Sequence, residues 1–454
     1  MRLLIQAWSL SLLALCADCA ASPQAPHDSL SGSWRGSAVF RRARLDFSVR
    51  FVGDGSAWRA FLSSPDLLLL DQPLDSVRLQ ALHVGFVTRD ERPLRFDGVL
   101  RGDSIRGTAP MPAVPGVLDL RGAETPALRF VLHRGSAPAA PPYTTREVRF
   151  KGAGIQLAGT LFVPVAGRGR HPGIVILQGS SSNLREEYRF YADHFARAGL
   201  AVLAFDKRGK GESSGDYEAA TYSDLAADAA AAVQFLRAQP RVAPEKVGVW
   251  GLSQGAFIAP LVAARVPSLA FIVAVSPPGI SIGETSAYQD SVRLRSIGFP
   301  PMDAARAAAL NRKLLTWLRT DSGAAPLAAE LSRAADTPWR RASALPASLP
   351  TGSALQGWYW RGRTLDPAPH WHALRTPVLV VFGGADELLP AALSAARIEQ
   401  ALRQGANPDF TVRVFPAANH VLRELPLVAG GAWDWPRAAS GYMDLVTRWV
   451  LERD

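Results

Sequence analysis

Two patterns of hydrophobic residues divide the chain. In the first third, apolar and polar residues alternate with a period of two, and the apolar positions of one such run are Leu45, Phe47, Val49 and Phe51. This alternation is typical of antiparallel strands that bury one face. We therefore predict an all-β antiparallel domain over residues 29–135, built as a small barrel or a sandwich, with hairpin turns at 53–55 and 101–103. A proline-rich linker over 136–144 follows it.

From residue 145 to residue 454 the pattern changes to short apolar runs that alternate with helical stretches. This arrangement predicts a mostly parallel sheet with helices on both faces. A representative helix is expected over 221–239, where Thr221 and Asp224 form a capping box. The predicted strands are 173–177, 201–205, 246–250, 269–275, 377–382 and 410–415.

One connection in this second region is about a hundred residues long, far beyond an ordinary loop. We predict a helical cap insertion at about 280–370, above the carboxyl ends of the strands. The aromatic residues of the insertion either line an apolar substrate pocket or form the cap's own core. They are Trp317, Trp339, Trp358, Tyr359 and Trp360, of which Trp358 and Trp360 are the pocket candidates.

The sequence Gly251-Leu252-Ser253-Gln254-Gly255 lies between a predicted strand and a predicted helix. Gly-x-Ser-x-Gly in this context is the nucleophile elbow, a strained turn that exposes the serine hydroxyl above the sheet. Ser253 is therefore the predicted nucleophile, and it needs a base and a carboxylate that holds this base in one tautomer.

The acid and the base are expected after later strands, in the order Ser, acid, His. Asp386 follows the strand 377–382 and is the predicted acid, with Glu387 as the alternative and a helix N-cap as a structural role for Asp386. His420 follows the strand 410–415 and is the predicted base. The other late histidines, His370 and His372, precede Asp386 and break this order.

An oxyanion hole requires two backbone N–H groups directed at the developing negative charge. One is expected from Gln254, the residue after the nucleophile, and the other from the loop that follows the strand 173–177. Ser180 is the predicted second donor, and Ser181 remains an alternative.

The segments 201–215 and 154–164 resemble characteristic stretches of the α/β-hydrolase superfamily, in its secreted serine aminopeptidase-like and dienelactone-hydrolase-like branch of esterases with an N-terminal β domain. The resemblance covers about 145–454 and implies a Ser-Asp-His acyl-transfer site at the predicted residues. Two departures, Gln178 and Ala256, stand where many members have His and Gly. Asp206 also follows a strand but precedes Ser253, and we interpret it as part of a structural ion pair, with Arg208 two residues away.

The N-terminal segment 1–21 has a basic start and an apolar stretch that is short for a membrane span, which predicts a signal peptide and export to the periplasm or the medium. Both cysteines, Cys16 and Cys19, lie in this segment, and lipid attachment there is a weaker alternative. The net charge of +10 comes mainly from arginines spread over the whole chain, so we expect no nucleic-acid partner. No metal motif is present, and the predicted chemistry needs no cofactor.

These observations predict an exported serine hydrolase that cleaves small carboxylic esters through an acyl-enzyme. A serine peptidase of the aminopeptidase or acylaminoacyl-peptidase type is the enzymatic alternative. A catalytically silent envelope-binding protein is the alternative outside the enzymes, and the sequence leaves the oligomeric state open.

Overall fold

The computed structural model describes residues 30–53, 57–89, 93–111, 127–136, 138–167, 169–180, 184–424, 427–428, 432–433 and 435–453. The predicted signal segment 1–21, most of the predicted turn 53–55 and the alternative oxyanion residue Ser181 lie outside these ranges.

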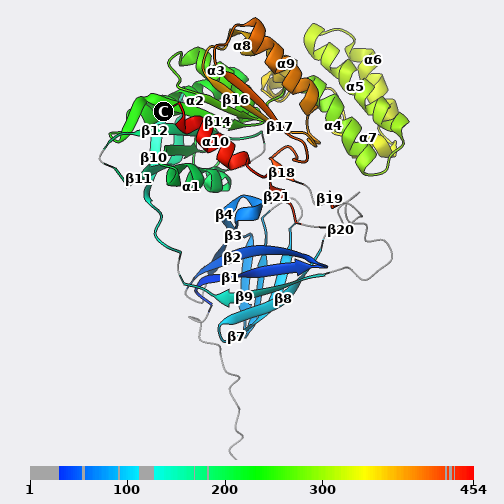
Figure 1. The fold of residues 1–454 in the computed structure, drawn as a ribbon. Helices are drawn as coiled ribbons and strands as arrows, with labels where there is room; N and C mark the ends of the chain where they lie inside the picture. Colours follow the sequence, from blue (N-terminus) through cyan, green and yellow to red (C-terminus); the bar gives the residue numbers. More distant parts are fainter. Residues whose placement is uncertain are drawn as a thin grey trace, which may run out of the picture.

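The N-terminal region forms one antiparallel sheet of nine strands in the order β4-β3-β2-β1-β9-β8-β7-β6-β5. The two edge strands, β4 and β5, follow each other in the sequence. Between them, the Leu74 N–H donates to the Ala60 carbonyl of β3 and the Asp75 N–H donates to the Val87 carbonyl of β6, so the two edges of the sheet lie close to each other. The sheet therefore curls into a half-barrel, as Figure 1 shows, and does not form the two packed layers of a sandwich. Its strands are β1 (Gly32–Phe40), β2 (Ala43–Gly53), β3 (Trp58–Ser64), β4 (Leu69–Pro73), β5 (Ser76–Gln80), β6 (His83–Val87), β7 (Arg95–Arg101), β8 (Ser104–Pro110) and β9 (Ala127–Arg134).

The alternating residues of β2 explain why this sheet curls around a core. Leu45, Phe47, Val49 and Phe51 are all buried, whereas the polar residues between them face outward or lie at intermediate depth. In the core, the rings of Phe86 and Phe96 stack with their centroids 4.7 Å apart. The apolar face predicted from the sequence is therefore the inner face of the half-barrel.

The second sheet has eight strands in the order β10-β11-β13-β12-β14-β15-β16-β17. The six strands from β12 to β17 run parallel, and β11 joins β13 in antiparallel orientation. The predicted α/β fold class is confirmed. The strands are β10 (Tyr143–Lys151), β11 (Gln156–Pro164), β12 (His171–Leu177), β13 (Ala201–Phe205), β14 (Val242–Leu252), β15 (Ile272–Val275), β16 (Val378–Gly383) and β17 (Phe410–Phe415).

Helices cover both faces of this sheet (Figure 1). Residues of α2, α3 and α9 share one hydrophobic cluster with the sheet, and residues of α1 and α10 share another. The capping box of α2 forms as expected, because Thr221 accepts a hydrogen bond from the Asp224 N–H at 3.1 Å and Asp224 accepts one from the Thr221 N–H at 2.8 Å. The helices are α1 (Arg189–Arg197), α2 (Tyr222–Arg237), α3 (Gln254–Arg265), α9 (Ala391–Gln404) and α10 (Tyr442–Leu451).

A helical insertion separates β15 from β16 and forms the cap. Trp317 and Trp339 lie in the cap's own hydrophobic cluster, and Trp360 packs against the same cluster while partly buried. Trp358 instead belongs to the core of the hydrolase sheet, where its ring centroid lies 5.2 Å from that of Tyr217. The helical segments are α4 (Ile282–Ser296), α5 (Pro301–Thr320), α6 (Ala324–Ala334), α7 (Pro338–Ala342), η4 (Gly352–Gln356), η5 (Arg361–Thr364) and α8 (Ala368–Ala373).

Side chains from the two regions also contact each other. Arg437, close to the C-terminal helix, donates to the Asp66 carboxylate at 3.0 Å, and Gln72 donates to the Glu186 carbonyl at 3.0 Å. Trp435 is buried within the hydrophobic cluster of the half-barrel. The end of the chain is therefore attached to both sheets.

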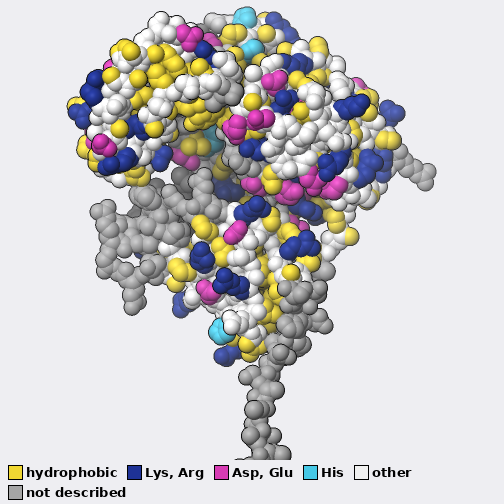
Figure 2. Space-filling view, turned by 180° about the vertical axis from the view of Figure 1, so that it is seen from behind, with side chains coloured by type: hydrophobic (Ala, Val, Ile, Leu, Met, Phe, Trp, Pro, Cys, Tyr) yellow, Lys and Arg dark blue, Asp and Glu magenta, His cyan; other side chains and the backbone are white. Residues whose placement is uncertain are grey.

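The surface carries mixed charge. Figure 2 shows basic side chains interspersed with acidic ones on the face in view. Among the helices that the structure describes, none combines the length and the apolar character that crossing a bilayer requires. Within the same residues, no three His, Cys, Asp or Glu side chains are grouped as metal ligands.

Asp206 forms a structural ion pair, but Arg208 is not its partner. The Asp206 carboxylate pairs with Arg185, and it also accepts hydrogen bonds from the Arg185 N–H at 3.0 Å and the Glu212 N–H at 3.1 Å. Arg208 points to α2 and pairs with Asp228 at 2.6 Å. The expected pairing was wrong because side chains two residues apart in this loop diverge toward different elements.

The Asp206 pair predicts a large effect on stability. Asp206 and Arg185 are both buried, so Asp206→Ala removes the only buried carboxylate that pairs with Arg185 among the described residues and leaves it the exposed carboxylates of Glu147 and Glu212. This loss should lower the free energy of unfolding by about 3 kcal/mol. Glu399→Ala, which removes an exposed i,i+4 pair with Arg403, should lower it by about 1 kcal/mol or less. Urea unfolding followed by fluorescence measures both, and equal shifts would contradict a structural role of the Asp206 pair.

Candidate functional site

Ser253 lies in a sharp turn between β14 and α3, with φ 54° and ψ −110°. This left-handed backbone is strained for a serine. It is fixed by close packing, because a Cβ on Gly255 would lie 2.1 Å from the Leu177 carbonyl oxygen and one on Gly251 would lie 2.5 Å from the Gly255 carbonyl carbon. Only glycine fits at these two positions, so the elbow predicted from the sequence is present.

His420 and Asp386 form a buried pair. The His420 Nδ1 atom lies 2.7 Å from the Asp386 Oδ2 atom, and both residues are less than a tenth exposed. The other carboxylate oxygen, Oδ1, accepts hydrogen bonds from the N–H groups of Leu388 at 2.8 Å and Leu389 at 3.0 Å. These two hydrogen bonds lie in the loop before α9, whose N-cap is Pro390, so Asp386 is not the helix N-cap that was the structural alternative. An Nδ1–H donated to Asp386 leaves the Nε2 lone pair free to accept a proton.

The loop that carries His420 is docked closely on the loop that carries Asp386. A Cβ on Gly383 would lie 2.1 Å from the Asn419 carbonyl oxygen, so the glycine that ends β16 allows the two backbones to touch. The Ser276 hydroxyl, at the end of β15, donates to the His420 carbonyl at 2.8 Å. Ser276 thus connects the histidine loop to the strand beside the nucleophile.

The register of the parallel strands brings the predicted residues to one edge. Leu252 of β14 pairs with Val275 of β15, and Val275 pairs with Val381 of β16. The Ser253 N–H then donates to the Val275 carbonyl at 2.8 Å. Because the carboxyl ends of parallel strands meet at the same edge, the loops that carry the nucleophile, the acid and the base converge there.

The alternative residues lie in less suitable places. Glu387 as a whole residue is exposed, but its carboxyl group is partly buried. This burial, together with the nearby Asp386 charge, raises the pKa of Glu387. His370 and His372 lie on α8, which precedes the amino end of β16 and therefore belongs to the opposite edge of the sheet. Asp386 is buried in contact with His420, and the geometry favours this pair.

The predicted oxyanion residues, Ser180 and Gln254, are connected by a residue that the sequence analysis missed. The Tyr217 hydroxyl lies 2.9 Å from the Ser180 carbonyl oxygen and 2.8 Å from the Gln254 Oε1 atom. Gln254 begins α3, so its N–H has no partner within the helix. A Cβ on Gly179 would lie 3.8 Å from the Ser253 Cβ atom, which places the oxyanion loop beside the nucleophile. No spacing in the sequence links Tyr217 to either loop.

Gln178, which replaces a frequent histidine, has a structural contact. Its side-chain Nε2 donates to the Phe205 carbonyl at 2.9 Å and so ties the end of β12 to the end of β13. Ala256, the other departure, is fully buried in the first turn of α3. Neither residue removes a group that the chemistry needs.

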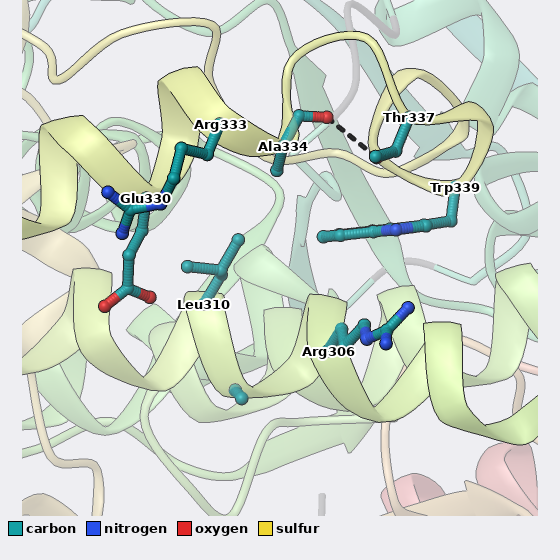
Figure 3. A pocket seen from close by; sticks show the side chains of 8 residues that line it. Arg306, Leu310, Glu330, Arg333, Ala334, Thr337 and Trp339 are labelled. Atoms are coloured by element: carbon teal, nitrogen blue, oxygen red, sulfur yellow. Dashed lines mark hydrogen bonds between the residues drawn. The ribbon is translucent and has the colours of Figure 1, made fainter.

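A cavity of about 360 Å³ lies in the cap between α5, α6 and α7. Figure 3 shows Leu310, Trp339, Arg306 and Arg333 among the side chains that line it. None of Ser253, Asp386 and His420 is among its lining residues. This cavity is therefore separate from the candidate catalytic site.

A mostly parallel sheet covered on both faces, with a serine elbow and an Asp-His pair at its carboxyl edge, defines an α/β hydrolase. The sequence profile of the peptidase S15 family, described as X-Pro dipeptidyl-peptidase, matches residues 153–411. This match covers more than half of the chain, and the chain belongs to this family.

Curated relatives match smaller parts. The chain is 32% identical to the thiohydrolase apmlB of Arthrinium phaeospermum over 138 residues, which are 29% of this chain and 43% of that protein. It is 23% identical to the quorum-quenching protein AidA of Acinetobacter baumannii, over 62% of this chain and 93% of that protein. The chain thus spans less than half the length of the thiohydrolase.

Solved structures of similar shape include the esterase Pf2001 of Pyrococcus furiosus, with a TM-score of 0.40, 21% identity and coverage of 63% of this chain and 88% of that one. Another is Est1E of Butyrivibrio proteoclasticus with bound ferulic acid, with a TM-score of 0.42, 18% identity and coverage of 67% and 96%.

The buried pair predicts which acid orients the base. Asp386→Asn should reduce kcat by about 10⁴-fold, because an amide facing Nδ1 favours the wrong imidazole tautomer. Glu387→Gln is the matched control and should change kcat by less than about 10-fold, because Asp386 and not Glu387 faces His420 Nδ1. Steady-state kinetics on an active ester measures both variants, and the reverse ranking would assign the acid to Glu387.

Proposed function

We propose that this protein is a serine hydrolase that cleaves carboxylic esters through an acyl-enzyme. The observation that carries the proposal is the buried Asp386–His420 pair, at 2.7 Å, on the sheet edge where the elbow presents Ser253. The family match supports a hydrolase of the S15 and α/β-hydrolase type.

In the proposed reaction, the Ser253 Oγ atom attacks the acyl carbon while His420 Nε2 accepts the hydroxyl proton. The oxygen of the tetrahedral intermediate is held by the N–H groups of Ser180 and Gln254. The intermediate expels the alcohol, which takes the proton from His420. Water, deprotonated by His420, then attacks the acyl-enzyme, and the acid is released while Ser253 Oγ takes the proton back from His420. The chemistry uses no cofactor.

Packing around the oxyanion loop supports an ester with an apolar group. Trp358 of the cap lies against Tyr217, and the Tyr217 hydroxyl contacts Gln254. Trp358 is therefore the cap tryptophan that we place at the acyl pocket, with Trp360 farther out on the cap's own cluster. An aromatic side chain at this position would suit a short or medium acyl chain.

A serine peptidase is the second candidate, and the description of the matched family as X-Pro dipeptidyl-peptidase favours it. Such an enzyme must recognise a free amine and a proline ring, in addition to the acyl carbon. For either activity, we propose export through residues 1–21 and a small-molecule or short-peptide substrate, with no nucleic-acid partner.

The nucleophile can be tested without knowledge of the substrate. A fluorophosphonate should label the protein at Ser253, and Ser253→Ala should abolish labelling and reduce ester turnover by at least about 10⁴-fold. Ser296→Ala, an exposed serine on the cap helix α4, is the control and should behave as wild type. Mass spectrometry of the labelled peptide locates the adduct. Labelling that survives in Ser253→Ala would place the nucleophile elsewhere.

The substrate class can be tested with p-nitrophenyl esters of increasing acyl length. Each methylene buried in the pocket contributes about 0.8 kcal/mol, so kcat/KM should rise with length until the pocket is full. Trp358→Ala should flatten this rise, whereas Trp339→Ala, in the cap's own core, should not.

The same assay should include Xaa-Pro p-nitroanilides. A higher kcat/KM for the anilides than for every ester would reject the esterase in favour of the peptidase. An unchanged length dependence in Trp358→Ala would limit this tryptophan to packing.

A further inference from the structure

The backbone of the oxyanion loop is anchored by side chains from three other segments. The Gly179 N–H donates to the Tyr188 hydroxyl at 2.9 Å, and the Ser180 carbonyl accepts from the Tyr217 hydroxyl at 2.9 Å. The Gly179 carbonyl accepts a hydrogen bond from the Lys207 ammonium at 2.6 Å. Of the four backbone polar groups of Gly179 and Ser180, these contacts occupy three. The fourth is the Ser180 N–H, which has no hydrogen-bond partner among the described residues.

Lys207 therefore acts on the same peptide unit that carries this N–H group. In a trans peptide the carbonyl and the N–H point in opposite directions, so a donor that fixes the Gly179 carbonyl also fixes the direction of the Ser180 N–H. A charged donor further strengthens the dipole of the peptide, since hydrogen-bonded groups polarise one another at low dielectric. We propose that Lys207 is a positioning residue that aims and polarises the Gly179–Ser180 peptide for stabilisation of the oxyanion. This inference rests on the proposed serine-hydrolase function.

Lys207 is a buried cation whose surroundings offset part of the cost of its burial. The residue is only 7% exposed, and its ammonium lies 4.4 Å from the centroid of the Tyr217 ring. The same tyrosine contacts Gln254, so Lys207 and Tyr217 together connect both oxyanion residues. Burial of a charged lysine costs free energy, and the 2.6 Å hydrogen bond and the cation–π contact offset part of this cost.

The charge of Lys207 should change within the working range of pH. Burial, with a smaller contribution from the Lys210 charge, lowers the pKa of Lys207 to about 7. Glu218 and Glu187 act in the opposite direction, and the neighbouring Arg208 and Asp228 neutralise each other as an ion pair. Lys207 is charged below this pKa and neutral above it. Polarisation of the Gly179–Ser180 peptide should therefore weaken as the pH rises.

The rate at which a fluorophosphonate modifies Ser253 tests this inference without a known substrate. In this reaction His420 takes the Ser253 hydroxyl proton, the Ser253 Oγ–P bond forms, the P–F bond breaks with release of fluoride, and the phosphoryl oxygen occupies the oxyanion hole. Loss of a whole oxyanion donor reduces a rate by about 10²–10³-fold, so loss of its polarisation in Lys207→Met should slow the labelling by about 10- to 100-fold. For a cleaved ester, kcat should fall to the same extent while KM changes little, because the oxyanion exists only after attack.

Lys210→Met is the matched control. The Lys210 ammonium lies 4.9 Å from the centroid of the same Tyr217 ring, but it pairs with Glu218 at 3.2 Å and not with the oxyanion loop. Labelling of this variant should proceed at the wild-type rate. A second measurement needs no variant: the labelling rate of the wild type should fall with rising pH above about 7, and Lys207→Met should lack this decline.

The outcomes separate the inference from the proposed function. Wild-type protein that is not labelled, or is labelled away from Ser253, would reject the serine-hydrolase function itself. Labelling at Ser253 with equal rates in the wild type and Lys207→Met would reject only the role of Lys207. Equal slowing by Lys210→Met, or a wild-type rate with no decline at alkaline pH, would also reject it. If Lys207→Met does not fold, the wild-type pH profile alone decides.

Discussion

The close contact between helix α3 and strand β12 sets the position of the whole candidate catalytic edge. Gly255 leaves no room for a side chain against the Leu177 carbonyl, so the helix starts directly above the end of the sheet. Ser253 then adopts a left-handed backbone, and the first N–H groups of α3 point to the space above the strands. A larger residue at position 255 would push the helix away and separate the serine from the oxyanion loop, which follows the same strand β12.

The remaining functional groups are placed by contacts between loops. Gly383, the last residue of β16, lets the His420 loop rest on the Asp386 loop, and Ser276 ties the His420 backbone to β15. On the other side of the serine, Tyr217 links the two oxyanion residues. The site is thus a set of loops fixed on consecutive strand ends, and the cap supports it through Trp358, which packs on Tyr217, and through Tyr288 of α4, whose hydroxyl donates to the Asp386 carbonyl at 3.0 Å.

Much of this arrangement could be predicted from the sequence because its signals are local. The elbow, the acid and the histidine each follow a recognisable strand, and parallel strands bring such positions to one edge. Long-range partners could not be predicted: Asp206 pairs with Arg185 instead of the nearby Arg208, and Tyr217 reaches both oxyanion residues from a loop without a motif. Alternation in β2 identified the buried face, but it could not distinguish a half-barrel from a sandwich, since both bury one face of each strand. The sequence also could not predict that Trp358 joins the core of the hydrolase sheet while Trp339 joins the core of the cap, because composition does not reveal which core a residue joins.

The most direct test of the account is a crystal structure of the protein after reaction with a phosphonate. We predict a covalent bond to the Ser253 Oγ atom, with the phosphoryl oxygen about 2.7–3.1 Å from the backbone nitrogens of Ser180 and Gln254 and with His420 Nε2 facing the adduct. An adduct on another residue, or a phosphoryl oxygen that faces away from these two nitrogens, would contradict the proposed site.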